Sequence, residues 1–363
     1  MNRPSKRLLA SAVVALLSST AVSACSSSVR STVTQSPAAT PRSSDARPPA
    51  HGSCQLGPKL VPQCGVLWGV ATKPPTERAI KDLESALGRT FDFVYRYHDV
   101  NQVIPDSAEG KLVAGGRILH IAIAARDFTS LDRASVTWAQ IAAGRFDASL
   151  SRQARGIASL NAPVFVTFEQ EANQKQKLGV LGTAGDFKAA WRHLHDLYAK
   201  AGATNVAWVW VMTGSQDNLS AAGTLWPGND VVDWVSWNVY NQSGCAGGEI
   251  SASKYVSFED KMLIFYNWMH DQGPAVGMDA TKPIMISEVG SAQYADDPQR
   301  SADWYAQIPA TLQKYPQIKA VALWASIDRT CDYRFQDNAV IARGVASASS
   351  QPLVNAVRIP NPR

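Results

Sequence analysis

The chain of 363 residues carries little charge of either sign. Asp, Glu, Lys and Arg make up 18% of it, and the formal net charge is +5. Three cations lie at the extreme N-terminus (Arg3, Lys6 and Arg7), so the remainder stands at about +2. No cluster of Lys and Arg follows. A nucleic-acid-binding protein needs such a cluster to neutralise phosphates, so the composition excludes a nucleic-acid partner.

Several signatures of catalysis are also missing. No G-x-G-x-x-G follows the first apolar run, which removes the usual support for a dinucleotide-binding fold. No G-x-S-x-G marks a nucleophilic serine, and no C-x-x-C pair indicates a metal site. His193 and His195 are two apart on a predicted helix, so they do not share a face. We therefore expect no metal and no cofactor.

Cysteine is scarce, with five residues, and the first of them has a distinctive setting. Cys25 directly follows the small residues Ser23 and Ala24, after a basic start and an apolar stretch, 8–22, that is short for a bilayer span. Residues 1–24 resemble a bacterial lipoprotein signal peptide, with Cys25 as the lipidated residue. An ordinary signal peptide cut nearby is the alternative. Both predict export, and lipidation predicts a membrane anchor on the extracytoplasmic face.

The segment 25–52 is rich in Ser, Thr, Pro, Ala and Arg and has almost no large apolar side chains. Such a segment cannot bury enough surface to offset the entropy of ordering, so we predict a flexible tether.

Four cysteines remain, and export makes disulfide bonds plausible. Four cysteines allow three pairings. We favour Cys54–Cys64, which closes a short loop at the start of the domain, and Cys245–Cys331, which follow two predicted strands. Free or metal-bound thiols are the alternative.

The remainder of the chain, 53–360, alternates apolar runs with helical patterns. We predict helices over 76–87, 137–160 (one or two), 184–201, 258–271, 301–314 and 336–357. The predicted strands are 65–72, 91–97, 117–125, 162–171, 206–212, 233–240, 283–289 and 318–327. Apolar strands separated by helices indicate a parallel sheet buried on both faces. Eight such units favour an α/β fold, a (β/α)8 TIM barrel in one domain, over an open doubly wound sheet.

Polar residues collect where these strands end, which in a barrel is the site of function. Glu171 and Glu288 each follow a long apolar run and lie three strands apart. Two carboxylates facing across a cleft are the apparatus of glycoside hydrolysis: one protonates the leaving oxygen and the other attacks the anomeric carbon.

Three segments carry a more specific resemblance. They are 141–173 (IAAGRFDASL…APVFVTFEQEAN), 226–235 (WPGNDVVDWV) with Tyr240 beyond it, and 282–290 (KPIMISEVG). In this order they are similar to glycoside hydrolase family 26, over about 140–330 with weaker cover back to 65. The resemblance implies a retaining β-glycanase acting on mannan, xylan or β-glucan.

The resemblance also implies roles for individual residues. Glu171 would be the acid/base and Glu288 the nucleophile. Tyr240 would hydrogen-bond the nucleophile, and Trp324 would be the platform under the sugar at the cleavage point. Further substrate-binding candidates are Gln170, Asn173, His98 and Trp226. Trp68 and Tyr97 either line a subsite or fill the barrel.

The chain departs from the family pattern around Glu171. Gln170 stands where the family has His, Thr167 stands where it has Arg, and residues 174–177 (QKQK) replace an aromatic cluster. The loss of stacking surface indicates that the chemistry carries over better than the substrate does.

Glu169 has two possible settings. On a regular strand it would share the face of Glu171 and point into the barrel, with Arg96 as a partner, where like-charge repulsion would raise the pKa of Glu171. On a twisted strand end it would lie in solvent.

The sequence therefore predicts a monomeric, retaining glycoside hydrolase that cleaves β-glycosidic bonds in a polysaccharide by double displacement. The alternative is a catalytically inactive carbohydrate-binding lipoprotein built on the same barrel.

Overall fold

The computed structural model describes residues 53–132, 135–245, 255–328 and 331–360. The predicted signal peptide, the tether and Cys25 lie outside these ranges. Within them, no helix combines the length and apolar character needed to cross a membrane.

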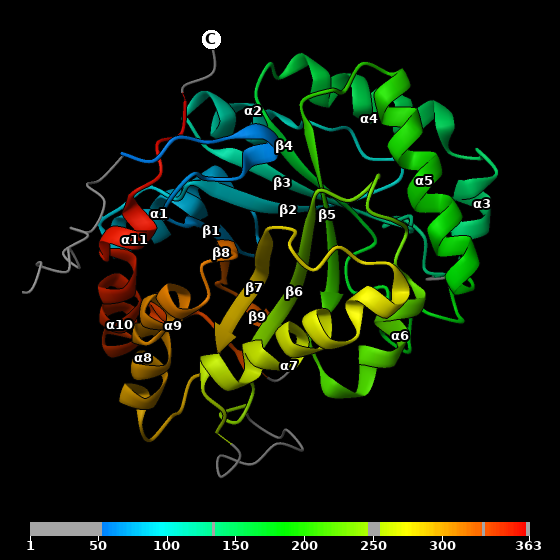
Figure 1. The fold of residues 1–363 in the computed structure, drawn as a ribbon. Helices are drawn as coiled ribbons and strands as arrows, with labels where there is room; N and C mark the ends of the chain where they lie inside the picture. The colour runs from blue at the N-terminus through cyan, green and yellow to red at the C-terminus, as the bar shows by residue number, and fades with distance from the viewer. Residues whose placement is uncertain (1–52, 133–134, 246–254, 329–330, 361–363) are drawn as a thin grey trace, which may run out of the picture. The chain divides into compact units, whose positions relative to one another are not determined.

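Eight parallel strands close into a barrel in sequence order, with β8 pairing back onto β1 (Figure 1). This confirms the predicted (β/α)8 TIM barrel. The strands are β1 (Leu67–Ala71), β2 (Phe93–Asp99), β3 (Ile118–Ala124), β4 (Val164–Phe168), β5 (Val206–Thr213), β6 (Trp234–Asn241), β7 (Ile284–Ser291) and β8 (Ile318–Trp324). A short hairpin of β9 (Ile327–Asp328) and β10 (Cys331–Asp332) follows.

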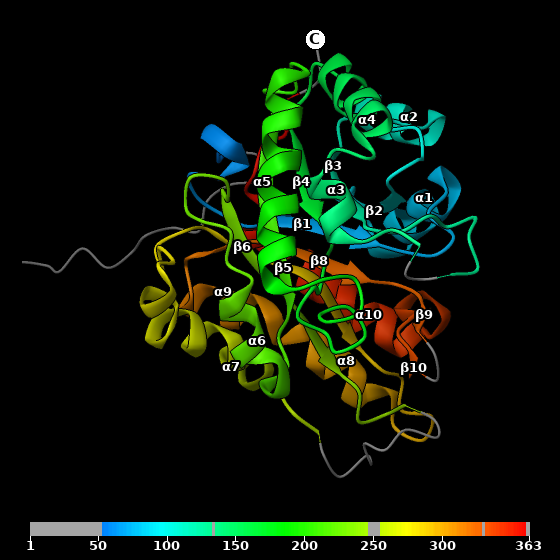
Figure 2. The same ribbon diagram turned by 90° about the vertical axis from the view of Figure 1, so that its right-hand side faces the viewer.

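Helices cover the outside of the barrel, and α3, α4 and α5 lie side by side over one flank (Figure 2). The helices are α1 (Glu77–Leu87), α2 (Ser107–Ala114), α3 (Trp138–Ala142), α4 (Asp147–Ser159), α5 (Ala184–Lys200), α6 (Leu219–Thr224), α7 (Phe258–Asp271), α8 (Pro298–Ala306), α9 (Ile308–Lys314), α10 (Ala339–Ser349) and α11 (Pro352–Asn355). Side-chain caps begin several of them, including capping boxes at α2, α3 and α5.

The predicted bounds differ from the structure where proline or backbone strain intervenes. The helix predicted over 301–314 is two helices, because Pro309 opens a new first turn in α9. The last predicted helix is likewise divided, with Pro352 beginning α11. The strand predicted over 162–171 ends at Phe168, since Glu169 and Glu171 adopt positive φ.

Side chains fill the barrel in layers. At the N-terminal end Phe165 packs edge-on against Phe93 and Trp234. Gly69 faces this layer, and a Cβ there would stand 2.5 Å from the Phe93 ring. The next layer holds His120, which stacks on Tyr95 with ring centroids 3.9 Å apart and bonds Thr167. Burial lowers the pKa of His120 to about 3, so this ring is neutral.

A bulge in β7 breaks the alternation of side chains just below the C-terminal end of the barrel. Trp237 pairs with Ile286, but the next residue, Asn238, pairs with Glu288, so Ser287 is skipped. Ser287 bonds Ser236 across the interior, and Glu288 also points inward. Two consecutive residues of β7 therefore face the interior, which a regular strand does not allow.

The Cys54–Cys64 disulfide closes the opposite end of the barrel and confirms the first predicted pairing. Cys54 packs with Leu67 and Phe93, which begin β1 and β2. In the same segment the Lys59 carbonyl accepts a hydrogen bond from the Trp234 indole at 2.7 Å. The segment thus covers the N-terminal ends of the strands.

Candidate active site

A pocket of about 660 Å³ opens at the C-terminal ends of the strands. Glu171 and Glu288 both lie in its wall, together with Tyr240 and Trp324 as predicted. The other lining residues are Thr72, Lys73, Pro75, Tyr97, Arg126, Phe128, Gln170, Gln174, Gln176, Thr213, Gly214, Ser215, Asn238, Val239, Gln242, Lys261, Asp328 and Tyr333. Amides and hydroxyls dominate this lining and suit a hydroxyl-rich ligand.

Glu171 is carried into the pocket by a strained turn. Glu169 and Glu171 have φ values of +48° and +57°, in the left-handed region that side chains other than glycine avoid. Each such residue costs on the order of 1–3 kcal/mol, and such strain concentrates at functional sites. The Glu171 N–H donates to the Val211 carbonyl at 2.8 Å, so the turn stays against β5, and the Glu171 side chain lines the pocket.

Glu169 anchors this turn. It is 2% exposed, its Oε1 lies 2.7 Å from Lys177 Nζ, and its Oε2 accepts a hydrogen bond from the Ala125 N–H at 2.6 Å. Lys177 also donates to the Gln170 carbonyl. Glu169 is thus structural and not in solvent. The expectation that Arg96 is its partner is wrong, because Arg96 turns outward to Glu109 and Asp106 on α2.

Glu288 accepts three hydrogen bonds. The hydroxyls of Tyr97 and Tyr240 each donate at 2.6 Å, and the Asn238 amide donates at 3.0 Å. Tyr240 is therefore placed as predicted, and Tyr97 belongs to the pocket. Donors to a carboxylate stabilise its ionised form, which is the form that a nucleophile needs.

Asn238 joins the two carboxylates. Its Nδ2 donates to Glu171 Oε1 at 2.9 Å and to Glu288 Oε2 at 3.0 Å. Both oxygens accept a hydrogen bond from the same nitrogen, so the distance between them is at most about 6 Å. The carboxyl groups of inverting pairs are typically ~6.5–9.5 Å apart. Strand alternation could have identified this residue, since Asn238 is two positions before Tyr240 on β6.

Glu171 and Glu288 both have a pKa above that of a free carboxyl group. Burial, reinforced by the neighbouring Glu171, raises the pKa of Glu288 to about 7, against the opposing effect of the Tyr240 and Tyr97 hydroxyls. Burial also raises the pKa of Glu171, and Lys177 and Asn238 oppose that rise. Two carboxyls with elevated pKa can share one proton near neutral pH, so that one acts as an acid while the other is ionised.

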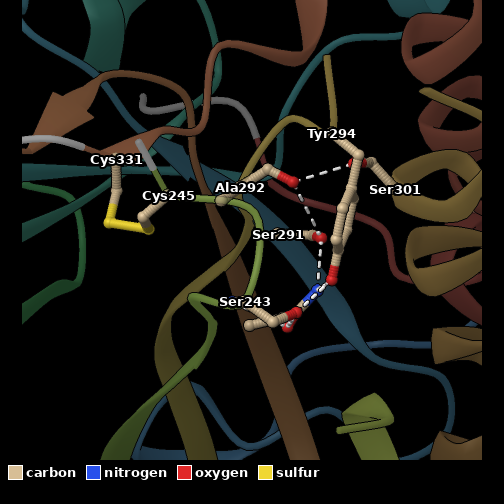
Figure 3. The surroundings of a disulfide bond; sticks show 8 residues. Ser243, Cys245, Ser291, Ala292, Tyr294, Ser301 and Cys331 are labelled. Atoms are coloured by element: carbon tan, nitrogen blue, oxygen red, sulfur yellow. Dashed lines mark hydrogen bonds between the residues drawn. A yellow bond between two sulfur atoms is a disulfide. The ribbon is translucent and has the colours of Figure 1, made fainter. Parts of the chain in front are cut away.

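The second disulfide, Cys245–Cys331, borders the pocket and confirms the second predicted pairing. It joins the segment after β6 to the hairpin after β8, on either side of the strand that carries Glu288. Beside it a buried network links Ser243, Tyr294 and Ser291 (Figure 3). The network holds the loop after β6 against the end of β7, and the disulfide holds the same loop against the hairpin after β8.

Three predicted substrate-binding residues lie elsewhere in the structure. His98 is 5% exposed and bonds Glu109 at 2.6 Å behind β2. The side chain of Asn173 bonds the backbone of Thr213, which fixes the loop after β4 to β5. Trp226 packs edge-on against Trp210 in the helix layer. None of the three is among the residues that line the pocket, and each makes its contacts within the fold.

Across the described residues, no group of three or more His, Cys, Asp or Glu side chains is arranged to hold a metal ion. Gln170 does line the pocket, and its Oε1 is buried without a hydrogen-bond partner among the described residues.

Comparisons of sequence and of fold with known proteins both find glycoside hydrolases. No family model matches the chain. The chain is 24% identical over 293 residues to endoglucanase H of Acetivibrio thermocellus, and 23% identical over 256 residues to the β-1,3-xylanase TXYA of a Vibrio species. These matches cover 77% and 69% of this chain but only 30% and 54% of the two relatives, so the chain spans about half or less of their length.

Among solved structures, the fold is similar to that of the GH26 β-mannanase of Bacteroides ovatus, with a TM-score of 0.57 at 14% identity over 80% of this chain and 90% of the other. A modular endo-β-1,4-mannanase of Cellulomonas fimi gives 0.58 at 13% identity, over 80% and 71%. At these identities the likeness establishes the barrel fold.

Proposed function

We propose that this protein is a retaining glycoside hydrolase, similar to family 26, that cleaves β-glycosidic bonds in a polysaccharide. The observation that carries the proposal is the bridge formed by Asn238, which holds Glu171 and Glu288 within about 6 Å of each other at the mouth of the barrel. The named activities of the relatives, an endoglucanase, a xylanase and mannanases, support the same class of reaction.

The proposal gives a role to each carboxylate. Glu288, with three donors on its carboxylate, attacks the anomeric carbon and forms a glycosyl ester as the glycosidic C–O bond breaks. Glu171 gives its proton to the departing oxygen. Glu171 then takes a proton from water, which attacks the same carbon, releases the sugar and frees Glu288. Trp324 supplies the apolar platform under the reacting sugar.

The test is release of reducing sugar from a panel of β-glycans and cell-wall glycans. Wild type should hydrolyse at least one, with retained anomeric configuration by NMR, and Glu288→Ala and Glu171→Ala should each lose at least about 10³-fold in kcat. Glu77→Gln, on the outer face of α1, should match wild type. Binding of glycans by every variant with hydrolysis by none would instead support the carbohydrate-binding alternative.

We further propose that the chain is exported and held on the extracytoplasmic face of the membrane by a lipid on Cys25. The support is the sequence around that residue. Cys25→Ala should move the protein from the membrane fraction to the soluble fraction of cells that express it, and an unchanged distribution would reject the anchor.

A further inference from the structure

Two pairs, each of a cation and an aromatic ring, stand in the pocket. Lys73 Nζ lies 4.9 Å from the ring centroid of Trp324, and the Arg126 guanidinium lies 5.6 Å from that of Phe128. All four side chains line the pocket, and Phe128 is 44% exposed. Trp324 ends β8, next to the strand of Glu288, while Arg126 and Phe128 follow β3, next to the strand of Glu171. One pair therefore stands on each side of the two carboxylates.

No carboxylate forms a salt bridge with these cations within the described part of the chain. Lys73, Arg126 and Lys261, a third cation in the lining, form no ion pair there, and Arg126 Nε is buried without a hydrogen-bond partner. Other partly or fully buried arginines, such as Arg96 and Arg117, are paired with carboxylates. A buried donor without a partner is costly, so the unpaired Arg126 Nε indicates an acceptor that arrives with the ligand.

The acidic residues of the described lining do not offset this charge. Apart from Glu171 and Glu288, which the reaction uses, Asp328 is the one carboxylate among them, and it is exposed. Three cations thus face one spare anion. A hydroxyl of a neutral glycan can accept a hydrogen bond from Arg126 Nε, but only a sugar with a negative group also balances the charge of the three cations.

We propose that the substrate is an anionic glycan, whose sugar rings carry carboxylate, sulfate or phosphate groups. The ring of one sugar stacks on Phe128 while its anionic group meets Arg126, and Lys73 meets the anionic group of a sugar on Trp324. This inference rests on the proposed function, which it extends by naming the class of substrate. The repeat of the pair fits a polymer with charge on more than one sugar.

The test uses matched oligosaccharides that differ only in charge. β-Linked oligouronides are compared with the same molecules after reduction of their carboxylates, and sulfated or phosphorylated oligosaccharides with their de-esterified forms. Binding is measured by calorimetry with the full chain carrying Glu288→Gln, so that no ligand is consumed. We expect one acidic form to bind at least about tenfold more tightly than its neutral partner, with an affinity that falls as salt rises.

Substitution then locates the preference. In the same background Arg126→Met and Lys73→Met should each weaken binding of the acidic form by about tenfold and that of the neutral form by much less. The matched controls are Arg152→Met on α4 and Lys200→Met on α5, which lie outside the pocket and should change neither affinity.

The outcomes separate this inference from the proposed function. Equal or tighter binding of every neutral form, or a preference that survives both pocket substitutions, overturns the anionic substrate even if neutral glycans are hydrolysed. A preference for one acidic form that is lost in Arg126→Met supports it even if wild type hydrolyses nothing, in which case the proposed function fails instead. The ester and carboxylate arms of the panel identify the kind of anion.

Discussion

Asn238 gives the candidate site a feature that neither carboxylate has alone. Its one amide nitrogen contacts both, so the position of each carboxylate depends on the other. The N–H groups also favour ionised carboxylates, and this contact lowers the pKa of Glu171 against the larger effect of burial. Asn238 is therefore a positioning residue that also tunes proton affinity.

Replacement of Asn238 should change both rate and pH dependence. We expect activity to fall at low pH as Glu288 gains a proton and at high pH as Glu171 loses its proton. Asn238→Ala removes a donor from Glu171, so the pKa of Glu171 rises and the alkaline limb of kcat/KM moves to higher pH. We expect kcat to fall by about tenfold to a hundredfold, because the carboxylates lose their common anchor. Hydrolysis measured from pH 4 to 9 gives both quantities.

Asn238→Asp sharpens this test. It keeps the shape of the side chain but replaces the amide donor with an oxygen of a third carboxylate group. It should therefore reduce kcat more than Asn238→Ala does. A wild-type alkaline limb in Asn238→Ala, or an aspartate variant as active as wild type, would contradict the role given to this residue.

At this scale the sequence predicted the residues with distinctive chemistry and missed those defined by their neighbours. Glu171 and Glu288 stand out because a carboxylate after an apolar run is conspicuous. Whether His98 faces the pocket or the helix layer depends on Glu109, eleven positions away on α2, and no local pattern reports that contact. Arg126 likewise matters because its Nε has no partner in the part of the chain that the structure describes, which only packing reveals.

At the scale of elements, the end of β4 is where structure and expectation diverge most. All eight strands and most of the helices follow from apolar periodicity, since burial of a parallel sheet imposes that pattern. No sequence pattern predicts the positive φ of Glu169 and Glu171, because glutamate does not favour that conformation. The turn persists because Lys177 and the Ala125 N–H hold Glu169 in place.

Glu169→Ala should therefore loosen the turn. It leaves the Ala125 N–H and the Lys177 ammonium without their partner, so the free energy of unfolding should fall by about 2 kcal/mol. The value of kcat should fall as well, although Glu169 does not line the pocket. Urea denaturation and hydrolysis assays measure the two effects.

The double variant Glu169→Ala/Lys177→Ala provides the control. If the ion pair is the anchor, the double variant should lose less stability than the two single variants together, because neither charge is left unpaired. Strict additivity would show that the two side chains act independently.

For the whole molecule, the two disulfides lie at opposite ends of the barrel. Cys54–Cys64 covers the N-terminal ends of the strands, and Cys245–Cys331 borders the pocket. Both pairings were predictable because each cysteine sits near an element whose position the barrel dictates. The network of Ser243 and Tyr294 beside the second disulfide was not, since it depends on how two loops meet.

Removal of each disulfide should have a different signature. Cys245→Ser opens a loop of 86 residues and should lower the free energy of unfolding by roughly 4 kcal/mol, and it should also raise KM because the pocket wall is released. Cys54→Ser opens a loop of 10 and should cost roughly 3 kcal/mol. Because Cys54 lies at the end of the barrel opposite the pocket, kcat and KM of Cys54→Ser should stay at wild-type values under conditions where the variant and the wild type are both folded.

A wild-type KM in Cys245→Ser would show that the loop after β6 needs no covalent support. A changed KM in Cys54→Ser would show that the two ends are coupled through the barrel. Chemical denaturation and initial-rate kinetics on the same preparations distinguish these results.

The bulge at Ser287 makes the nucleophile depend on the parity of a strand. Counted from Met285, which faces the interior, strict alternation would send Glu288 outward with Ile286 and would turn Val289 inward. One inserted residue reverses that count and delivers the carboxylate inward. Loss of the bulge with Ser287 retained would leave the composition unchanged and yet turn Glu288 outward and abolish the active site, whereas loss of Ser287 itself would restore regular alternation with Glu288 still inward. In evolutionary terms, this barrel can exchange catalysis for simple binding by a change in strand register rather than in chemistry.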